Sequence, residues 1–155
     1  LGTAFEEALE PLIRARLFGA IRPGEFATQH TSDCVHQSAV QPGDRVCPCG
    51  AGVIYTPDHL LFNGVSRLGE FKLTKMSIRK GLTDRRFDKW FCQMKVYCKH
   101  LRTLYARLYV LFVNGDYTTF ASDLRAWDIE FSQKEVDEEW AILLRYGRRK
   151  GMIPA

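Results

Sequence analysis

Long hydrophobic runs are missing from this chain of 155 residues. The longest, residues 108–113, has the length of one strand, whereas a membrane-spanning helix needs roughly 18 or more consecutive apolar residues. The sequence also opens without the charged segment, apolar core and small-residue cleavage site of a signal peptide. We therefore expect no membrane partner and an intracellular, cytoplasmic protein, and we leave open whether its source is a phage or a virus.

A disulfide framework is missing as well. The five cysteines are odd in number and irregularly spaced, which indicates reduced thiols. Cys34, His36, Cys47 and Cys49 offer ligands that suit zinc. However, a single residue separates Cys47 from Cys49, and structural zinc sites usually place about two to four residues between paired cysteines. We therefore expect no zinc at these residues.

A strong charge of one sign is also absent. Lys and Arg number 22 against 18 Asp and Glu, a net charge of +4 that permits a nucleic-acid partner without requiring one. The bases are unevenly distributed, because between residues 72 and 107 the only acids are Asp84 and Asp88. Six basic residues are candidates for contact with a phosphate backbone: Lys75, Arg79, Lys80, Arg85, Arg86 and Lys89. A solvated helix face is the alternative interpretation.

The sequence contains alternating helix and strand patterns, in a number that fits a single domain. No internal repeat or low-complexity linker divides it, and an aromatic content of 12% supports a packed core, so we expect one domain over residues 1–155. The patterns predict helices at 3–18 and 85–105, strands at 53–62, 65–76, 108–113 and 117–121, a strand around Trp127 to Phe131, and a last helix opened by a capping box of Ser132 and Glu135. A polar loop is expected at 25–52. This order predicts an α/β fold with one mixed sheet packed by helices.

Charged side chains interrupt the strand predicted at 65–76. Glu70 and Lys72 share one face of that strand, because side chains alternate with a period of two. Phe71 and Leu73 share the other face. Their apolar character predicts that they face the core and that the charged pair points away from it.

Whether Asp58 joins this pair depends on the loop around Asn63 and Gly64. A bare two-residue turn would place Asp58 opposite Gly69, on the other face from Glu70. A three-residue loop with Gly64 in the left-handed position reverses the parity, and Asp58 then shares a face with Glu70. We predict an odd-length loop or a bulge.

Two carboxylates and one lysine on a shared face suit the hydrolysis of a phosphodiester. Carboxylate oxygens are the ligands that Mg²⁺ or Mn²⁺ prefers, and a site with two of them leaves coordination positions for water and phosphate oxygens. A lysine beside them can activate water and stabilise negative charge in the transition state. The alternative is an ordinary surface pair of Glu70 and Lys72, which contributes little to stability.

The residues Pro57-Asp58 followed by Glu70-Phe71-Lys72 resemble the signature of the PD-(D/E)XK nucleases. This resemblance implies a restriction-endonuclease-like core, with a central mixed sheet flanked by helices in the order α-β-β-α-β-β-α. It also implies a Mg²⁺- or Mn²⁺-dependent deoxyribonuclease that acts on DNA, in which Asp58 and Glu70 bind the metal and Lys72 activates water.

Two further segments resemble the RecB-like and lambda-exonuclease-like branch of this family. Gln93 and Tyr97, one turn apart on the predicted helix, match its QxxxY motif, which lines the active site. Residues 2–6 resemble the start of its first helix, which implies a third metal ligand at Glu6, with Glu10 as a substitute. From the residues alone, Tyr97 is as well suited to the apolar stripe of its helix as to an active site. In the same way, Glu6 is as well suited to a solvated helix face as to a metal site.

The resemblance favours an exonuclease over an endonuclease. Two other functions remain open: a non-catalytic nucleic-acid-binding module on the same fold, and a nuclease directed at RNA. The sequence leaves open whether the protein is a homo-oligomer.

Overall fold

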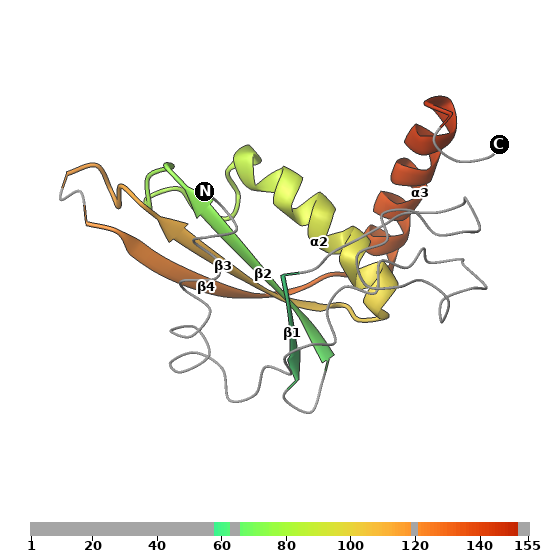
Figure 1. Cartoon of the computed structure of the whole chain (residues 1–155), viewed down its shortest axis with the longest axis horizontal. Helices are drawn as coiled ribbons and strands as arrows, with labels where there is room; N and C mark the ends of the chain where they lie inside the picture. The colour runs from blue at the N-terminus through green and yellow to red at the C-terminus, as the bar shows by residue number, and fades with distance from the viewer. Residues whose placement is uncertain (1–57, 63–65, 119–120, 152–155) are drawn as a thin grey trace.

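A four-stranded mixed sheet with one helix lying across one of its faces forms the body of the structure (Figure 1). The computed structural model describes residues 58–62, 66–118 and 121–151. The predicted first helix at 3–18 and the predicted loop at 25–52 lie outside these residues. In chain order the elements are β1 (His59–Phe62), β2 (Ser66–Thr74), the 3-10 helix η1 (Arg85–Phe87), α2 (Asp88–Leu101), β3 (Tyr105–Phe112), β4 (Asp123–Glu130) and α3 (Gln133–Arg149).

The order of strands across the sheet is β1-β2-β3-β4. β2 and β3 are parallel neighbours, whereas β1 pairs with β2 and β3 pairs with β4 in antiparallel fashion. A parallel pair needs a long crossover connection, and η1 with α2 supplies it. The prediction of an α/β fold with a mixed sheet and packed helices is therefore confirmed for the described residues.

The core lies between α2 and one face of the sheet. α2 buries an apolar stripe of the predicted spacing against this face. The first turn of α3 completes the core with Val136. The buried residues of this cluster include Leu68, Phe87, Trp90, Met94, Cys98, Leu108, Val110, Phe112, Phe131 and Val136. Phe87 and Trp90 meet edge to face with ring centroids 4.8 Å apart, a geometry that adds to the stabilisation from burial.

The long helix is shorter than its pattern predicts. It was expected over 85–105, but α2 begins at Asp88 and ends at Leu101. Arg102 takes a left-handed conformation (φ 52°) and its N–H bonds back to the carbonyl of Cys98, which closes the helix. Tyr105 consequently opens β3 and does not extend the helix. The apolar stripe continues through this change, so periodicity alone could not locate the end.

The strand predicted at 117–121 is wrong for the described part of that segment. Asn114, Gly115 and Asp116 do form a turn, as predicted, but the chain stays irregular through Thr118, and β4 begins at Asp123. Gly115 has φ +52°, and a Cβ at this position would lie 2.0 Å from the carbonyl oxygen of Ala121. The chain therefore folds back so tightly here that only glycine fits.

The predicted capping box at the start of α3 is confirmed. Ser132 Oγ accepts from the backbone N–H of Glu135 at 3.2 Å, and Glu135 Oε2 accepts from the backbone N–H of Ser132 at 2.9 Å. Val136 and Trp140 bury the inner face of this helix against α2. Among the described helices, none is long and apolar enough to cross a membrane.

Candidate functional site

The loop between β1 and β2 has the odd length that the shared site requires. Phe62 pairs with Ser66 and His59 pairs with Gly69, so three residues connect the strands and the register is unbroken. One step beyond His59, Asp58 comes opposite Glu70. Because directly opposed residues of an antiparallel pair point to the same face, the two carboxylates share a face of the sheet. The predicted parity is therefore confirmed.

Asp58 is held against β2 by the backbone of that strand. It lies just before β1, and its Oδ2 accepts a hydrogen bond of 2.8 Å from the N–H of Phe71. Phe71 stands between Glu70 and Lys72 in the chain, so this bond brings the Asp58 carboxylate to the charged pair. The sequence motif contained the three charged residues but gave no sign of this backbone contact.

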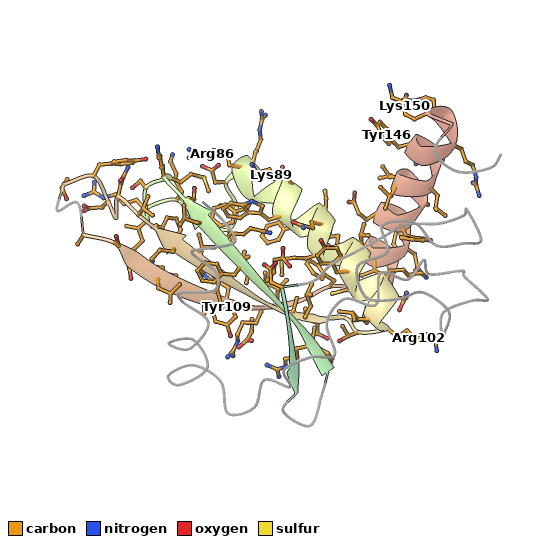
Figure 2. All side chains as sticks on the ribbon, viewed as in Figure 1. Arg86, Lys89, Arg102, Tyr109, Tyr146 and Lys150 are labelled. Carbon is orange, nitrogen blue, oxygen red and sulfur yellow. The ribbon has the colours of Figure 1, made fainter. Side chains whose placement is uncertain are left out.

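Glu70 is fully buried, and the prediction that its side chain points away from the core is wrong. It shares a face with Leu68 and pairs with Leu108 on β3, both of which belong to the core beneath α2. Phe71 is also buried, but on the opposite face of the sheet, where it pairs with Tyr109. Figure 2 shows Tyr109 on the side of the sheet away from α2.

Burial leaves Glu70 in an electrostatically unfavourable position. Its Oε2 atom has no hydrogen-bond partner among the described residues. Burial, followed by repulsion from Asp58, raises the pKa of Glu70 from 4.5 to about 7, against the lowering effect of Lys72. A buried carboxylate oxygen without a partner is costly in a native structure, which makes Glu70 the least favourably placed charged group of the described core.

Lys72 supplies the positive charge of the site. Its Nζ donates to Glu70 Oε1, and 18% of its side chain remains exposed to solvent. It follows Glu70 on the same face of β2, where it pairs with Val110 of β3. Lys72 is therefore anchored to the buried carboxylate through its ammonium, and its side chain is partly exposed to solvent.

Gln93 and Tyr97 approach the same charges from α2. Gln93 Nε2 donates to Tyr97 Oη at 2.8 Å, as their spacing of one helical turn allows. Burial, in the main, raises the pKa of Tyr97, and the charges of Glu70, Lys72 and Asp58 also act on it. Elements far apart in the sequence thus bring Tyr97 into the electrostatic field of the two acids and the lysine, and Gln93 is hydrogen-bonded to Tyr97.

The donor set of this site fits one hard divalent cation. Mg²⁺ is usually held by one or two protein carboxylates and keeps several waters, and Asp58 and Glu70 provide two carboxylates, one with a free oxygen. The described residues contain no group of three or more His, Cys, Asp or Glu that could hold a metal. The candidate third ligand, Glu6, and its substitute, Glu10, lie outside the described residues. So do Cys34, His36, Cys47 and Cys49, for which no zinc was expected.

The six basic residues predicted to contact nucleic acid are all exposed and lie between the end of β2 and the first turn of α2. Three of them have acidic neighbours: Arg79 bonds Asp116 at 3.1 Å, and Arg86 and Lys80 share Asp84 at 2.8 Å and 3.9 Å. Lys75, Arg85 and Lys89 have no ion-pair partner among the described residues. Figure 2 shows Arg86 and Lys89 at the end of α2 that is farther from α3.

We call the six basic residues of the preceding paragraph the basic end. Lys89 connects the basic end to the candidate site. It precedes Gln93 by four residues on α2, and Gln93 precedes Tyr97 by four. Residues four apart are neighbours on one side of a helix, about 6 Å apart along its axis. The basic end therefore continues along α2 as a polar ridge that reaches the two acids.

Residues of α3 that border the site were missed by the sequence reasoning. Ile142 and Tyr146 are about half exposed although both are large and apolar, and both line a groove together with Gln93 and Tyr97. The available signal was an apolar pair one turn apart, followed after Gly147 by the basic residues at 148–150.

No protein-family model and no curated protein matches this chain. Among solved structures, the chain is similar to the crystal structure of SSO0001, with a TM-score of 0.46 and a sequence identity of 11%. The similarity covers 95% of this chain and 59% of that one, so the chain spans less than two thirds of that protein's length. A similarity of this degree says nothing about function.

Proposed function

We propose that this protein is a Mg²⁺- or Mn²⁺-dependent nuclease that hydrolyses phosphodiester bonds of DNA. One observation carries the proposal: the fully buried Glu70 keeps one carboxylate oxygen without a partner, beside a second carboxylate and a lysine. A fold gains no stability from this arrangement, because burying a charge without full compensation costs free energy. A bound cation would give Glu70 the partner it lacks.

In this proposal Asp58 and Glu70 hold the metal ion, and Glu6, in the helix predicted from the sequence, would complete the set. Once bound, the ion would lower the pKa of a coordinated water and neutralise charge on the scissile phosphate. The hydrogen bond from Phe71 N–H fixes the orientation of Asp58, and the rigid middle of β2 fixes Glu70. Both carboxylates are thus held in position before any substrate arrives, which is the condition for efficient electrostatic catalysis.

Lys72, Gln93 and Tyr97 then act on the water and the phosphate. The Lys72 ammonium would orient the attacking water and stabilise the negative charge that develops on the phosphate oxygens. Tyr97 is hydrogen-bonded to Gln93, and the raised pKa of Tyr97 keeps its hydroxyl protonated, so it can donate to a phosphate oxygen. The exposed Lys75, Arg85 and Lys89 would bind the backbone next to the scissile bond.

The described elements run β-β-α-β-β-α, which is compatible with the larger restriction-endonuclease-like order once a first helix precedes them. We include that core in the proposal, together with exonuclease action, on the strength of the QxxxY resemblance. Within the described residues, Asp58, Glu70, Lys72 and the polar face of α2 all belong to the sheet edge, β2 and the crossover helix.

The test is cleavage of linear and circular DNA in Mg²⁺, in Mn²⁺ and in EDTA. We expect metal-dependent cleavage, faster on linear DNA, that falls on the order of 10²-fold or more in Glu70→Gln and in Lys72→Ala. Glu130→Gln and Lys134→Ala are matched controls, because both residues are exposed and lie on β4 and α3, away from the site. Cleavage in EDTA, or wild-type rates in both site variants, would overturn the proposal.

A further inference from the structure

A groove of about 350 Å³ lies between α2 and α3, beside the candidate site. The two helices meet near the start of α3 and diverge from there, as Figure 1 shows. α2 contributes Gln93, Val96 and Tyr97 to its walls, and α3 contributes Glu139, Ile142 and Tyr146. Its volume falls at the lower end of the ~300–1,000 Å³ range of small-molecule pockets, which suits one planar ring system.

The α3 wall of this groove is apolar and exposed, and its rim is basic. Ile142 is 50% exposed and Tyr146 is 46% exposed. Two cations lie over the Tyr146 ring: Arg149 Cζ is 5.7 Å and Lys150 Nζ is 5.9 Å from its centroid. Figure 2 shows Tyr146 and Lys150 projecting from α3 on the side toward α2. The groove therefore offers an aromatic face with positive charge directly beside it.

Each wall of the groove also carries one polar side chain. Gln93 of α2 can both donate and accept hydrogen bonds, and the carboxylate of Glu139 on α3 can accept them from an amino group. Arg148, Arg149 and Lys150 are all exposed at the end of α3, and none of them has an ion-pair partner among the described residues. An aromatic face, a pair of polar side chains and flanking cations are the three elements by which proteins bind an unstacked base and its phosphate.

The groove is continuous with the candidate site, because Gln93 and Tyr97 belong to both. A ring system lying against Tyr146 would have its attached backbone close to the polar ridge of α2. The ridge leads from there to the two acids and Lys72.

We propose that the α2–α3 groove binds one unstacked nucleobase of the substrate strand, next to the phosphate that is cleaved. This inference rests on the proposed nuclease function and deepens it: the substrate is a strand with a single-stranded or frayed end. Tyr146 stacks on the base, Gln93 and Glu139 contact its edge, and the cations at 148–150 bind the adjoining phosphates. A fully paired internal base cannot enter a groove of this kind without leaving its stack.

The test measures binding in EDTA, so that it does not depend on cleavage. Fluorescein-labelled single-stranded oligonucleotides with normal bases, and matched ones with abasic residues at the labelled end, are titrated and followed by anisotropy. We expect Tyr146→Ala to weaken binding of the normal oligonucleotide about tenfold and Tyr146→Phe to leave it nearly unchanged, because stacking needs the ring and not the hydroxyl. The abasic oligonucleotide should bind wild type and Tyr146→Ala equally weakly.

Tyr105→Ala is the matched control, because Tyr105 is a comparably exposed tyrosine, 40% accessible, that lies on β3 outside the groove. Equal weakening by this control would overturn the inference, as would equal affinity of wild type for normal and abasic strands. Sedimentation of the protein alone tests another occupant: a wild-type dimer that Tyr146→Ala converts to monomer would assign the groove to a second copy. Metal-dependent cleavage without base-dependent binding defeats this inference alone, whereas base-dependent binding without cleavage defeats the proposed nuclease.

Discussion

Asp58 Oδ2 accepts a hydrogen bond of 2.8 Å from the backbone N–H of Phe71, so a residue at the edge of the sheet is fixed to the strand that carries Glu70 and Lys72. The bond gives Asp58 two separable properties. Its geometry depends on an oxygen that accepts a hydrogen bond, whereas its proposed role as a metal ligand depends on its negative charge.

Asp58→Asn separates these two properties, because the amide oxygen can still accept from Phe71 N–H while the charge is lost. We expect thermal stability to be retained or increased, since repulsion between the carboxylates of Asp58 and Glu70 disappears. Metal-dependent cleavage should fall on the order of 10²-fold or more. Asp58→Ala should lose cleavage and also about 1 kcal/mol of stability. A fully active Asp58→Asn would remove Asp58 from the metal site.

Glu70 makes the stability of the metal-free protein depend on pH. The pKa of Glu70 is about 7 in the fold against 4.5 for the free side chain, so between these values the native state binds more protons than the unfolded state. Stability contributed by the neutral carboxyl is therefore present below pH 4.5 and is lost as pH rises through 7. For a side chain with no exposed surface, the full shift corresponds to about 3–4 kcal/mol, most of which falls between pH 5 and pH 8.

Glu70→Gln should remove this dependence. Chemical denaturation in EDTA at pH 5 and pH 8 should show the stability difference between variant and wild type moving about 2–3 kcal/mol in favour of the variant at the higher pH. Added Mn²⁺ should then stabilise wild type at pH 8 but not Glu70→Gln, because a ligand stabilises only the state that binds it. If the stability difference between Glu70→Gln and wild type did not change between pH 5 and pH 8, the fold would not disfavour the charged form of Glu70.

The hydrogen bond between Gln93 and Tyr97 predicts that removing the Tyr97 hydroxyl reduces the rate of cleavage more than it reduces the stability of the fold. Tyr97→Phe keeps the ring in its half-buried place and removes only the hydroxyl that Gln93 contacts. We expect cleavage to fall about tenfold or more, with a stability change of about 1 kcal/mol or less. Tyr105→Phe serves as the control, since Tyr105 lies outside the site. Equal rates for the two variants would reduce Gln93 and Tyr97 to a structural pair on the helix face.

The parity of the β1–β2 hairpin could be predicted from the sequence because it has only two solutions, and a shared site is compatible with one of them. The face that carries the site could not be predicted in the same way. Alternation correctly separated Glu70 from Phe71 but assigned the core to the more apolar side, whereas Glu70 lies beneath α2 with Leu68. A period-two pattern identifies the core by its apolar content, and a buried functional carboxylate breaks that rule.

Tertiary placement explains the remaining differences. The approach of Tyr97 to Glu70 depends on how α2 crosses the sheet, and the groove that includes Tyr146 depends on the angle at which α3 leaves β4. Neither angle is encoded in a local pattern of residues. The Ser132–Glu135 cap, by contrast, involves only neighbours in the chain, and its sequence signature was sufficient to predict it.

The residues of the basic end should contribute unequally to the salt dependence of DNA binding, because some of them are already paired with acids. Arg85 and Lys89 are exposed and have no ion-pair partner among the described residues, so each is available to a phosphate. Arg79 is already paired with Asp116 at 3.1 Å. We expect Arg85→Ala and Lys89→Ala each to reduce the slope of log K against log salt concentration by about 1, and Arg79→Ala to reduce it less.

Anisotropy titrations of a short duplex with a single-stranded end, in EDTA at several salt concentrations, provide these slopes. Lys134→Ala is the control, because Lys134 is a fully solvated lysine on α3 whose partner is Glu138, one turn away. Its slope should equal that of wild type. If Lys134→Ala changed the slope as much as Lys89→Ala, the attraction would come from net charge alone. DNA would then have no defined path from the basic end along α2 to Glu70.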